Sequence, residues 1–134
     1  MKIIDGTNAV LGRLASYVAK QALKGEEFAI VNCGQIIITG NRKNIEEKQF
    51  ASRQRVGSGQ KGPKISRLAH LIVKKTIRGM LPNYRKGRGK QAFQRIKCYV
   101  GIPKEFEDKK KIIAGKKITT KFVTIKQISK ENVK

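Results

Sequence analysis

The fold of this chain is decided by its N-terminal stretch, KIIDGTNAVLGRLASYVAKQALKGEEFAIVN, residues 2–32. Residues 2–4 have the pattern of a short strand. The apolar side chains of residues 9–24 recur at the spacing that places them on one face of a helix. Residues 28–32 are almost continuously apolar, which is typical of a parallel strand covered on both faces. The stretch therefore predicts a strand–helix–strand unit.

The rest of the chain continues this alternation. The residue pattern predicts a strand at 36–39, a helix at 44–53, an amphipathic helix within 64–80, a short helix at 91–95 and a strand at 96–100. Ile45 and Phe50 are expected to make the main apolar contacts of the helix 44–53, and the Gly-rich segments 57–63 and 84–90 are expected to be flexible loops. We predict an α/β fold, with a small, mostly parallel sheet of about four strands between helices, basic loops and a C-terminal extension.

Charge is distributed unevenly along the chain. It carries 31 Lys and Arg residues against 9 Asp and Glu residues, a formal net charge of +22. Residues 1–47 hold six bases and five acids, residues 48–104 hold sixteen bases and no acid, and residues 105–134 hold nine bases and four acids. The middle segment needs a polyanionic partner to offset its self-repulsion. Nucleic acid is the first candidate and an anionic membrane the second.

The membrane is the weaker candidate. The longest uninterrupted apolar run is four residues, 28–31, far short of the about 20 needed to cross a bilayer. Asp5 interrupts the N-terminus before a signal-peptide core could form, and the chain has no Trp for an interfacial belt. We therefore expect an intracellular protein with no membrane partner.

Signals of catalysis and of metal or cofactor binding are weak. Residues 57–62 match the G-x-G-x-x-G pattern of dinucleotide-binding loops, but they follow no strand, and no acid lies about twenty residues further on. His70 is the only histidine, and Cys33 and Cys98 lie far apart without ligand spacing. No carboxylate in residues 48–104 could orient a base or hold Mg²⁺. We predict a non-enzymatic protein without cofactor, metal site or small-molecule substrate.

The acid-free middle segment instead predicts binding to structured RNA. Its loops are rich in Gly, which lets a backbone approach phosphates closely. Aromatic residues make up only 6% of the chain, which argues against a base-stacking platform for single strands. The side chains expected to meet phosphates are Arg53, Arg55, Lys61, Lys64, Arg67, Lys74, Lys75, Arg78, Arg85, Lys86, Arg88, Lys90 and Arg95, of which Arg78 and Arg88 are the strongest candidates. The glycines expected to let the backbone approach RNA are Gly57, Gly59, Gly62, Gly87 and Gly89.

The domain organisation follows from length and charge. A chain of 134 residues suits one compact domain. We expect a single α/β RNA-binding domain over residues 1–104. Residues 105–134 are expected to form a basic extension that packs on the domain or on RNA.

Three blocks of the sequence resemble the universal large-subunit ribosomal protein thirteen family. They are residues 8–20 (NAVLGRLASYVAK), residues 31–43 (VNCGQIIITGNRK), and residues 78–82 (RGMLP) with the basic loop and residues 92–101 that follow. Gly62-Pro63 and Gly101-Ile102-Pro103 resemble the archaeal and eukaryotic branch more than the bacterial one. The resemblance implies a parallel sheet between helices and a structural role in the large subunit of the cytoplasmic ribosome. The implied partners are large-subunit rRNA and neighbouring ribosomal proteins.

One segment departs from the family's pattern. Relatives often carry an aromatic residue or His and a Pro shortly after the Gly-Pro, where this chain has KISRLA, residues 64–69. The start of the second amphipathic helix therefore stays open. Residues 64–67 either belong to that helix or form an RNA-facing strand.

Two rival functions are also compatible with the sequence. Non-specific compaction of nucleic acid would need the positive charge alone, and would show as equal binding to duplex DNA and to rRNA. A nucleotide-binding α/β enzyme would use the strand-to-helix turns, and would bind a free nucleotide saturably at micromolar concentration and be stabilised by it.

Overall fold

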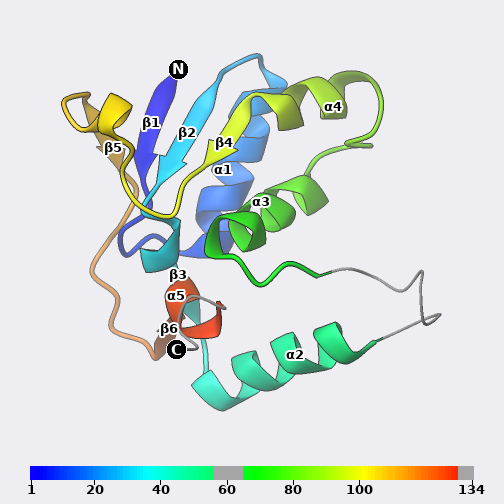
Figure 1. Cartoon of the computed structure of the whole chain (residues 1–134), viewed down its shortest axis with the longest axis vertical. Helices are drawn as coiled ribbons and strands as arrows, with labels where there is room; N and C mark the ends of the chain where they lie inside the picture. The colour runs from blue at the N-terminus through cyan, green and yellow to red at the C-terminus, as the bar shows by residue number, and fades with distance from the viewer. Residues whose placement is uncertain (56–64, 130–134) are drawn as a thin grey trace.

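The computed structural model describes residues 1–55 and 65–129 and has a four-stranded parallel sheet at its centre (Figure 1). The strands are β1 (Lys2–Asp5), β2 (Phe28–Val31), β4 (Ile96–Cys98) and β5 (Lys111–Ile113). Their order is β4-β2-β1-β5, and every neighbouring pair is parallel. The predicted α/β fold with a small parallel sheet is confirmed.

Strand β2 lies inside the sheet, as its composition predicts. All four of its residues are buried; Ile30 pairs with Ile4 of β1, and Phe28 pairs with Ile96 of β4. A strand with neighbours on both sides and cover on both faces leaves no place for a polar side chain. The continuous apolar run of β2 is the consequence.

Three helices cover one face of the sheet (Figure 1): α1 (Leu11–Leu23), α3 (Ala69–Met80) and α4 (Gly87–Gln94). The side chains that fill this layer are Ile4, Phe28 and Ile30 from the sheet, Leu14, Val18 and Ala22 from α1, and Ile72, Val73 and Ile77 from α3. Burying one such large aliphatic or aromatic side chain contributes about 1.5–3 kcal/mol. This layer is therefore the main core of the protein.

The opposite face of the sheet has a smaller cover. Phe106, in the 3₁₀ turn Lys104–Phe106, packs on Ile3 and Val31. Its ring meets that of Tyr99 edge-on, with centroids 5.7 Å apart and planes at 62°. The segment around residue 105 thus shields this face from water.

Strand β3 (Ile37–Thr39) lies outside the main sheet, beyond the 3₁₀ turn Cys33–Gln35. It pairs antiparallel with β6 (Phe122–Thr124), with Ile38 opposite Val123. Helix α5 (Ile125–Ile128) follows β6 directly and buries Ile125 in the main core. The strand expected at 36–39 is confirmed, but its partner comes from the other end of the chain.

Helix α2 (Arg42–Gln54) lies apart from the sheet, at the other end of the molecule from α4 (Figure 1). It begins two residues earlier than predicted because the Asn41 side chain accepts a hydrogen bond from the Lys43 backbone N–H (3.2 Å) and so caps the helix. None of its residues is buried. The expectation that Phe50 makes a main apolar contact is wrong, since 60% of its surface is exposed.

The loop expected at 84–90 is half helical. The Lys86 backbone N–H donates to the Asn83 carbonyl (3.2 Å), and α4 begins at Gly87, whose φ of +61° suits glycine. Gly89 is buried, and a Cβ there would overlap the Pro82 carbonyl oxygen. The expectation that Gly89 brings the backbone close to RNA is therefore wrong. The absence of a side chain at Gly89 lets α4 pack on the turn that precedes it.

The helix predicted within 64–80 begins at Ala69. Before it, the Leu68 backbone N–H donates to Ser66 Oγ (3.3 Å), and residues 65–67 are neither helix nor strand. Neither alternative for the start of this segment therefore holds for its described residues.

Candidate nucleic-acid interface

Helix α3 turns its basic side chains away from the core. Lys75 is exposed, and Lys74 and Arg78 are half-buried, whereas Val73 and Ile77 on the other side of the helix are fully buried. The helical repeat of 3.6 residues places positions 74, 75 and 78 on one face. The structure therefore brings these three predicted bases together.

Two aromatic rings lie beside this face of α3. They belong to Tyr84, which precedes α4, and to Phe93, near the end of α4. The rings of Tyr84 and Phe93 meet edge-on, with centroids 6.2 Å apart. Lys74 Nζ lies 4.9 Å from the Phe93 centroid, and the Arg78 and Arg85 guanidinium carbons lie 4.7 and 5.4 Å from the Tyr84 centroid. A cation over an aromatic face is attracted by the ring's quadrupole, so the rings hold these bases in place. We call these five residues the α3–α4 cluster.

The positive charge around Tyr84 also affects the pKa of its phenol. Arg85 Nε donates a hydrogen bond to Tyr84 Oη (3.2 Å). This hydrogen bond, together with the charges of Arg85 and Arg78, lowers the pKa of the Tyr84 phenol. The cluster is therefore a site of uncompensated positive potential.

Other predicted bases surround the start of α4. Lys86, Arg88 and Lys90 are exposed. Lys86 and Arg88 line a shallow cavity of about 340 Å³ beside Leu23 and Pro82. These side chains can reach a polyanion without moving the backbone.

Arg95 has a partner inside the protein. Its Nη1 donates to the Ala22 carbonyl (3.2 Å) in the last turn of α1. The Ala22 carbonyl also accepts the Gly25 backbone N–H (3.1 Å), so Arg95 adds a charged donor at the C-terminus of α1, where a cation interacts well with the helix dipole. Arg95 therefore connects the end of α4 to the end of α1.

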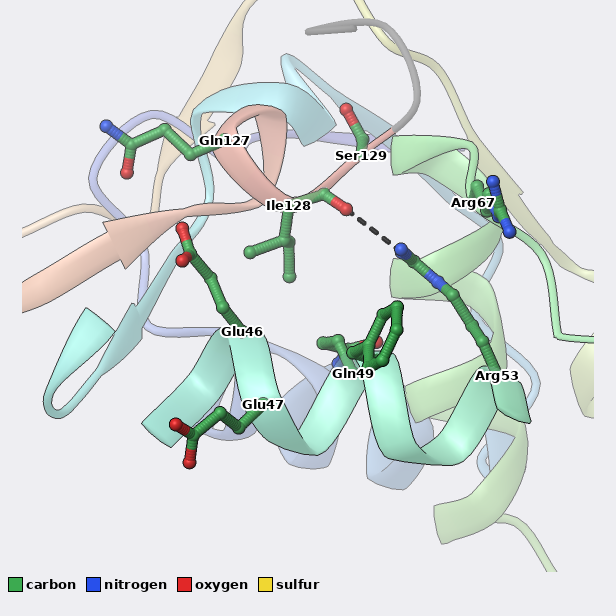
Figure 2. Close-up of a pocket in the computed structure, with 9 residues that line it drawn as sticks. Glu46, Glu47, Gln49, Arg53, Arg67, Gln127, Ile128 and Ser129 are labelled. Carbon is green, nitrogen blue, oxygen red and sulfur yellow. Dashed lines mark hydrogen bonds between the residues drawn. The ribbon is translucent and has the colours of Figure 1, made fainter. Parts of the chain in front are cut away.

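Arg53 and Arg67 meet at a second place, a groove of about 520 Å³ between α2 and residues 127–129 (Figure 2). Arg53 Nη2 donates to the Ile128 carbonyl (3.0 Å), drawn as a dashed line in Figure 2. Burial and the charge of Arg67 lower the pKa of Arg53. We call this cavity the α2 groove. Arg55 lies exposed just beyond the end of α2.

Five predicted site residues lie outside the described part of the chain: Gly57, Gly59, Lys61, Gly62 and Lys64. The structure therefore places the other predicted bases in two groups, one around α3 and α4 and one at the α2 groove.

Acidic partners do not neutralise these groups. Within residues 1–55 and 65–129 the ion pairs are Lys2–Glu26 and Arg42–Glu46, each with an N···O distance of 2.7 Å. Neither pair involves a predicted site residue. The bases around α3 and α4 therefore have no ion-pair partner among the described residues, whereas Glu46 and Glu47 line the α2 groove together with Arg53 and Arg67.

Known proteins resemble this chain in sequence over most of its length. The family model described as ribosomal protein L13 matches residues 1–105. The chain belongs to the ribosomal protein L13 family. A relative from Methanocaldococcus jannaschii, named large ribosomal subunit protein uL13, is 44% identical over 138 residues, which cover 97% of this chain and 96% of the relative. Proteins of the same name from Methanococcoides burtonii (40% identical; 98% of this chain, 96% of the relative) and Thermoplasma volcanium (43%; 98% and 97%) are also similar.

Membership of the L13 family confirms three predictions. The recognised family is correct, the relatives are archaeal as the branch assignment expects, and the protein is a structural ribosomal protein rather than an enzyme.

Across the described residues, no group of three His, Cys, Asp or Glu side chains could hold a metal ion. In the same residues, no helix combines the length and the apolar composition that crossing a membrane requires.

The carboxyl ends of β1 and β2, where α/β enzymes usually bind ligands, hold a structural network in this L13 protein. Asp5 Oδ1 accepts hydrogen bonds from the Thr7 backbone N–H (3.0 Å), Thr7 Oγ1 (2.7 Å) and Asn32 Nδ2 (3.0 Å). Burial alone would raise the pKa of Asp5, but these hydrogen bonds outweigh it and lower the pKa. The carboxylate is thus committed to fixing the turn after β1.

Sequence reasoning missed the aromatic part of the α3–α4 cluster. Aromatic residues are few in this L13 protein, but Tyr84, which precedes α4, and Phe93, near the end of α4, converge beside the basic face of α3. The usable signal was local, since Tyr84 and Phe93 flank the most basic loop. The sequence also indicated that Phe50 could belong to a binding surface, because it is a large apolar residue on a highly charged helix.

Proposed function

We propose that this protein is a structural component of the large ribosomal subunit in the cytoplasm, where it binds and holds together segments of large-subunit rRNA. The α3–α4 cluster is the observation that carries the proposal. It presents three cations fixed by two aromatic rings, and no acid faces them among the described residues. Fixed cations lose less side-chain entropy on meeting phosphates than free ones do.

The proposed contacts divide by role. Exposed bases neutralise backbone phosphates and set the position of the RNA, whereas base identity contributes little. The residues proposed to meet RNA are Arg53, Arg55, Lys61, Lys64, Arg67, Lys74, Lys75, Arg78, Arg85, Lys86, Arg88, Lys90 and Arg95, with the glycines Gly57, Gly59 and Gly62. Arg53 and Arg95 also bind carbonyls within the protein, so their contribution to RNA binding is expected to be smaller.

Neighbouring ribosomal proteins are the second class of proposed partner. Ile112 and Ile113 on the edge strand β5 are exposed, and Ile113 retains 79% of its surface. Apolar residues on a free sheet edge favour contact with another protein. These residues lie in the basic extension proposed for 105–134, which supplies β5 to the sheet.

The salt dependence of binding tests the proposal. If the wild-type protein neutralises six to ten phosphates, its affinity for large-subunit rRNA falls by about 10³–10⁵ between 50 and 200 mM salt. The double substitution Lys74→Gln and Arg78→Gln should reduce the slope of log K against log salt by about 2. The matched control is Arg13→Gln with Lys20→Gln, which removes the same charge from exposed positions of α1.

A competition experiment between rRNA and duplex DNA distinguishes the proposed function from non-specific compaction of nucleic acid. Duplex DNA of equal charge is added to the rRNA complex across the salt series. The proposal expects rRNA to be retained in preference at every salt concentration. Equal displacement by duplex DNA, or an equal effect of the α1 and α3 double substitutions, would contradict it.

A further inference from the structure

The α2 groove has two chemically different ends (Figure 2). Glu46 and Glu47 line one end, where Glu46 Oε1 also accepts a hydrogen bond from Arg42 Nε (2.7 Å), and Arg53 and Arg67 line the other. Ile128 extends from the opposite wall into the space between the ends (Figure 2). The volume of about 520 Å³ lies within the range of small-molecule sites, about 300–1,000 Å³.

Helix geometry explains the order of these groups. Glu46, Phe50 and Arg53 are separated by four and three residues, so they share one face of α2. At 1.5 Å per residue they span about 10 Å along the helix axis. The exposed ring of Phe50 therefore lies between a carboxylate and a guanidinium, on a helix that buries none of its residues.

The basic end has an unused hydrogen-bond donor. Arg53 Nη2 binds the Ile128 carbonyl, but Arg53 Nε is buried and has no hydrogen-bond partner among the described residues. A buried donor without a partner is unfavourable, because no hydrogen bond offsets its loss of hydration. The side chain of Arg67 brings a second guanidinium to the same end of the groove (Figure 2). An anion at this end would relieve the repulsion between the two cations and accept hydrogen bonds from their guanidinium groups.

We propose that the α2 groove binds one unpaired nucleotide of the rRNA, with its phosphate at Arg53 and Arg67 and its base between Phe50 and Ile128. The inference rests on the proposed function and adds to it a defined RNA subsite. Stacking on an aromatic ring is a general mode of binding unpaired bases, because every base has a π-face. An acidic peptide would match the arginine end alone, whereas a nucleotide also places amino groups toward the two glutamates.

The glutamates give the groove a preference among bases. A carboxylate accepts a hydrogen bond from the exocyclic amino group of cytosine and repels the carbonyl oxygen that uracil carries at the same position. Because the glutamate end is solvent-exposed, the preference for cytosine over uracil should be about threefold. Substituting both glutamates, Glu46→Gln and Glu47→Gln, should remove it.

The first test compares two exposed phenylalanines. Phe50 and Phe122 retain 60% and 46% of their surfaces, and Phe122 lies on β6 outside the groove. Phe50→Ala should weaken binding to large-subunit rRNA about tenfold without changing the salt slope, because a stacked base is lost and no phosphate contact is removed. Phe122→Ala should leave the affinity unchanged. Equal affinities of the two variants, with a steep salt response retained, would overturn the subsite and leave the proposed function standing.

The second test uses free nucleotides on the full-length protein. Cytidine 5′-monophosphate, uridine 5′-monophosphate and inorganic phosphate are titrated separately while the side-chain NMR signals of Phe50, Ile128 and Phe122 are followed. The two nucleotides should shift the Phe50 and Ile128 signals through the ring current of the base, whereas phosphate should affect the arginine end only. Arg67→Gln should weaken both nucleotides equally. Shifts at Phe50 no larger than those at Phe122 would overturn the proposal, as would Phe50 and Ile128 responding only to an added ribosomal protein.

Discussion

Helices α1 and α3 pack side by side on the same face of the sheet, yet the exposed bases of the two helices have different surroundings. Both helices bury one apolar side in the same core. On α1 the exposed bases, such as Arg13 and Lys20, form no cation–π pair among the described residues, whereas on α3 Lys74 and Arg78 lie over the rings of Phe93 and Tyr84. The difference is that a neighbouring element holds the bases of α3 in position, and under the proposed function this is what makes α3, rather than α1, the RNA-binding surface.

The largest effect is expected from separating α4 from the turn that precedes it. Gly89→Ala places a Cβ where the Pro82 carbonyl oxygen lies, so α4 must shift. We expect a loss of about 1–2 kcal/mol of stability, since overpacking outweighs the better helix propensity of Ala. rRNA affinity should fall as well, because Tyr84 and Phe93 no longer fix the bases of α3.

The matched control is a glycine in α3 itself. A Cβ at Gly79 would meet nothing within 4 Å, so Gly79→Ala should raise stability by up to about 0.5–1 kcal/mol. Urea unfolding measures both variants. Destabilisation of similar size at the two positions would show that the Gly89 packing does not hold α4 in place.

On the α1 side, the turn after β1 should carry a pH-dependent part of the stability. The pKa of folded Asp5 lies below its unfolded value, so the carboxylate stabilises the fold above the unfolded pKa, and this contribution is lost as the pH falls through the folded pKa. Asp5→Asn should therefore cost about 1 kcal/mol at pH 7 and little at strongly acidic pH.

Chemical denaturation across a pH series measures this difference between wild type and Asp5→Asn. rRNA affinity at pH 7 should be unchanged, because the network lies on the α1 side. A stability difference that stays constant with pH would show that the Asp5 charge is not what fixes the turn.

Arg95 connects the two regions that are compared, because it follows α4 and binds the Ala22 carbonyl at the end of α1. Arg95→Gln removes the hydrogen bond to the Ala22 carbonyl and should lower stability by about 1 kcal/mol. Arg88→Gln is the matched control, since Arg88 is exposed and has no hydrogen bond or ion pair within the described residues. Thermal unfolding should separate the two variants, and salt titration of rRNA binding should reverse their order. The same order in both measurements would contradict the separate roles.

The sequence predicted elements whose pattern is local, and missed contacts that depend on distant residues. α1 and β2 followed from periodicity and from a continuous apolar run, because their side chains meet the same core over their whole length. β5 has three residues, of which two are exposed, so no pattern in Lys111–Ile113 marks it as the fourth strand of the sheet. The start of α4 contains Gly87 and Gly89, and packing against Pro82 overrides their weak helix propensity.

The candidate site shows the same limit. Composition showed where bases concentrate along the chain, and helical spacing predicted that Lys74, Lys75 and Arg78 share one face, as they do on α3. It could not show that Arg53 meets Arg67 across a groove or that Tyr84 meets Arg78, since both contacts depend on how separate elements pack. The sequence also gives no sign of the second role of Arg95, because its partner is a backbone carbonyl.

The smallest expected effect tests the central point of the comparison, the holding of bases by aromatic rings. Tyr84→Phe keeps the ring beneath Arg78 and Arg85 and removes only the hydrogen bond to Arg85, so rRNA affinity should change by less than about twofold. Tyr84→Leu also removes the cation–π attraction, worth about 0.5–1 kcal/mol at an exposed site, and should weaken binding by about two- to fivefold. Neither variant changes the number of charges, so the salt slope should stay constant and the loss should appear in affinity at every salt concentration. If Tyr84→Leu binds as tightly as Tyr84→Phe, the rings do not position the bases, and α3 would differ from α1 only in its distance from the RNA.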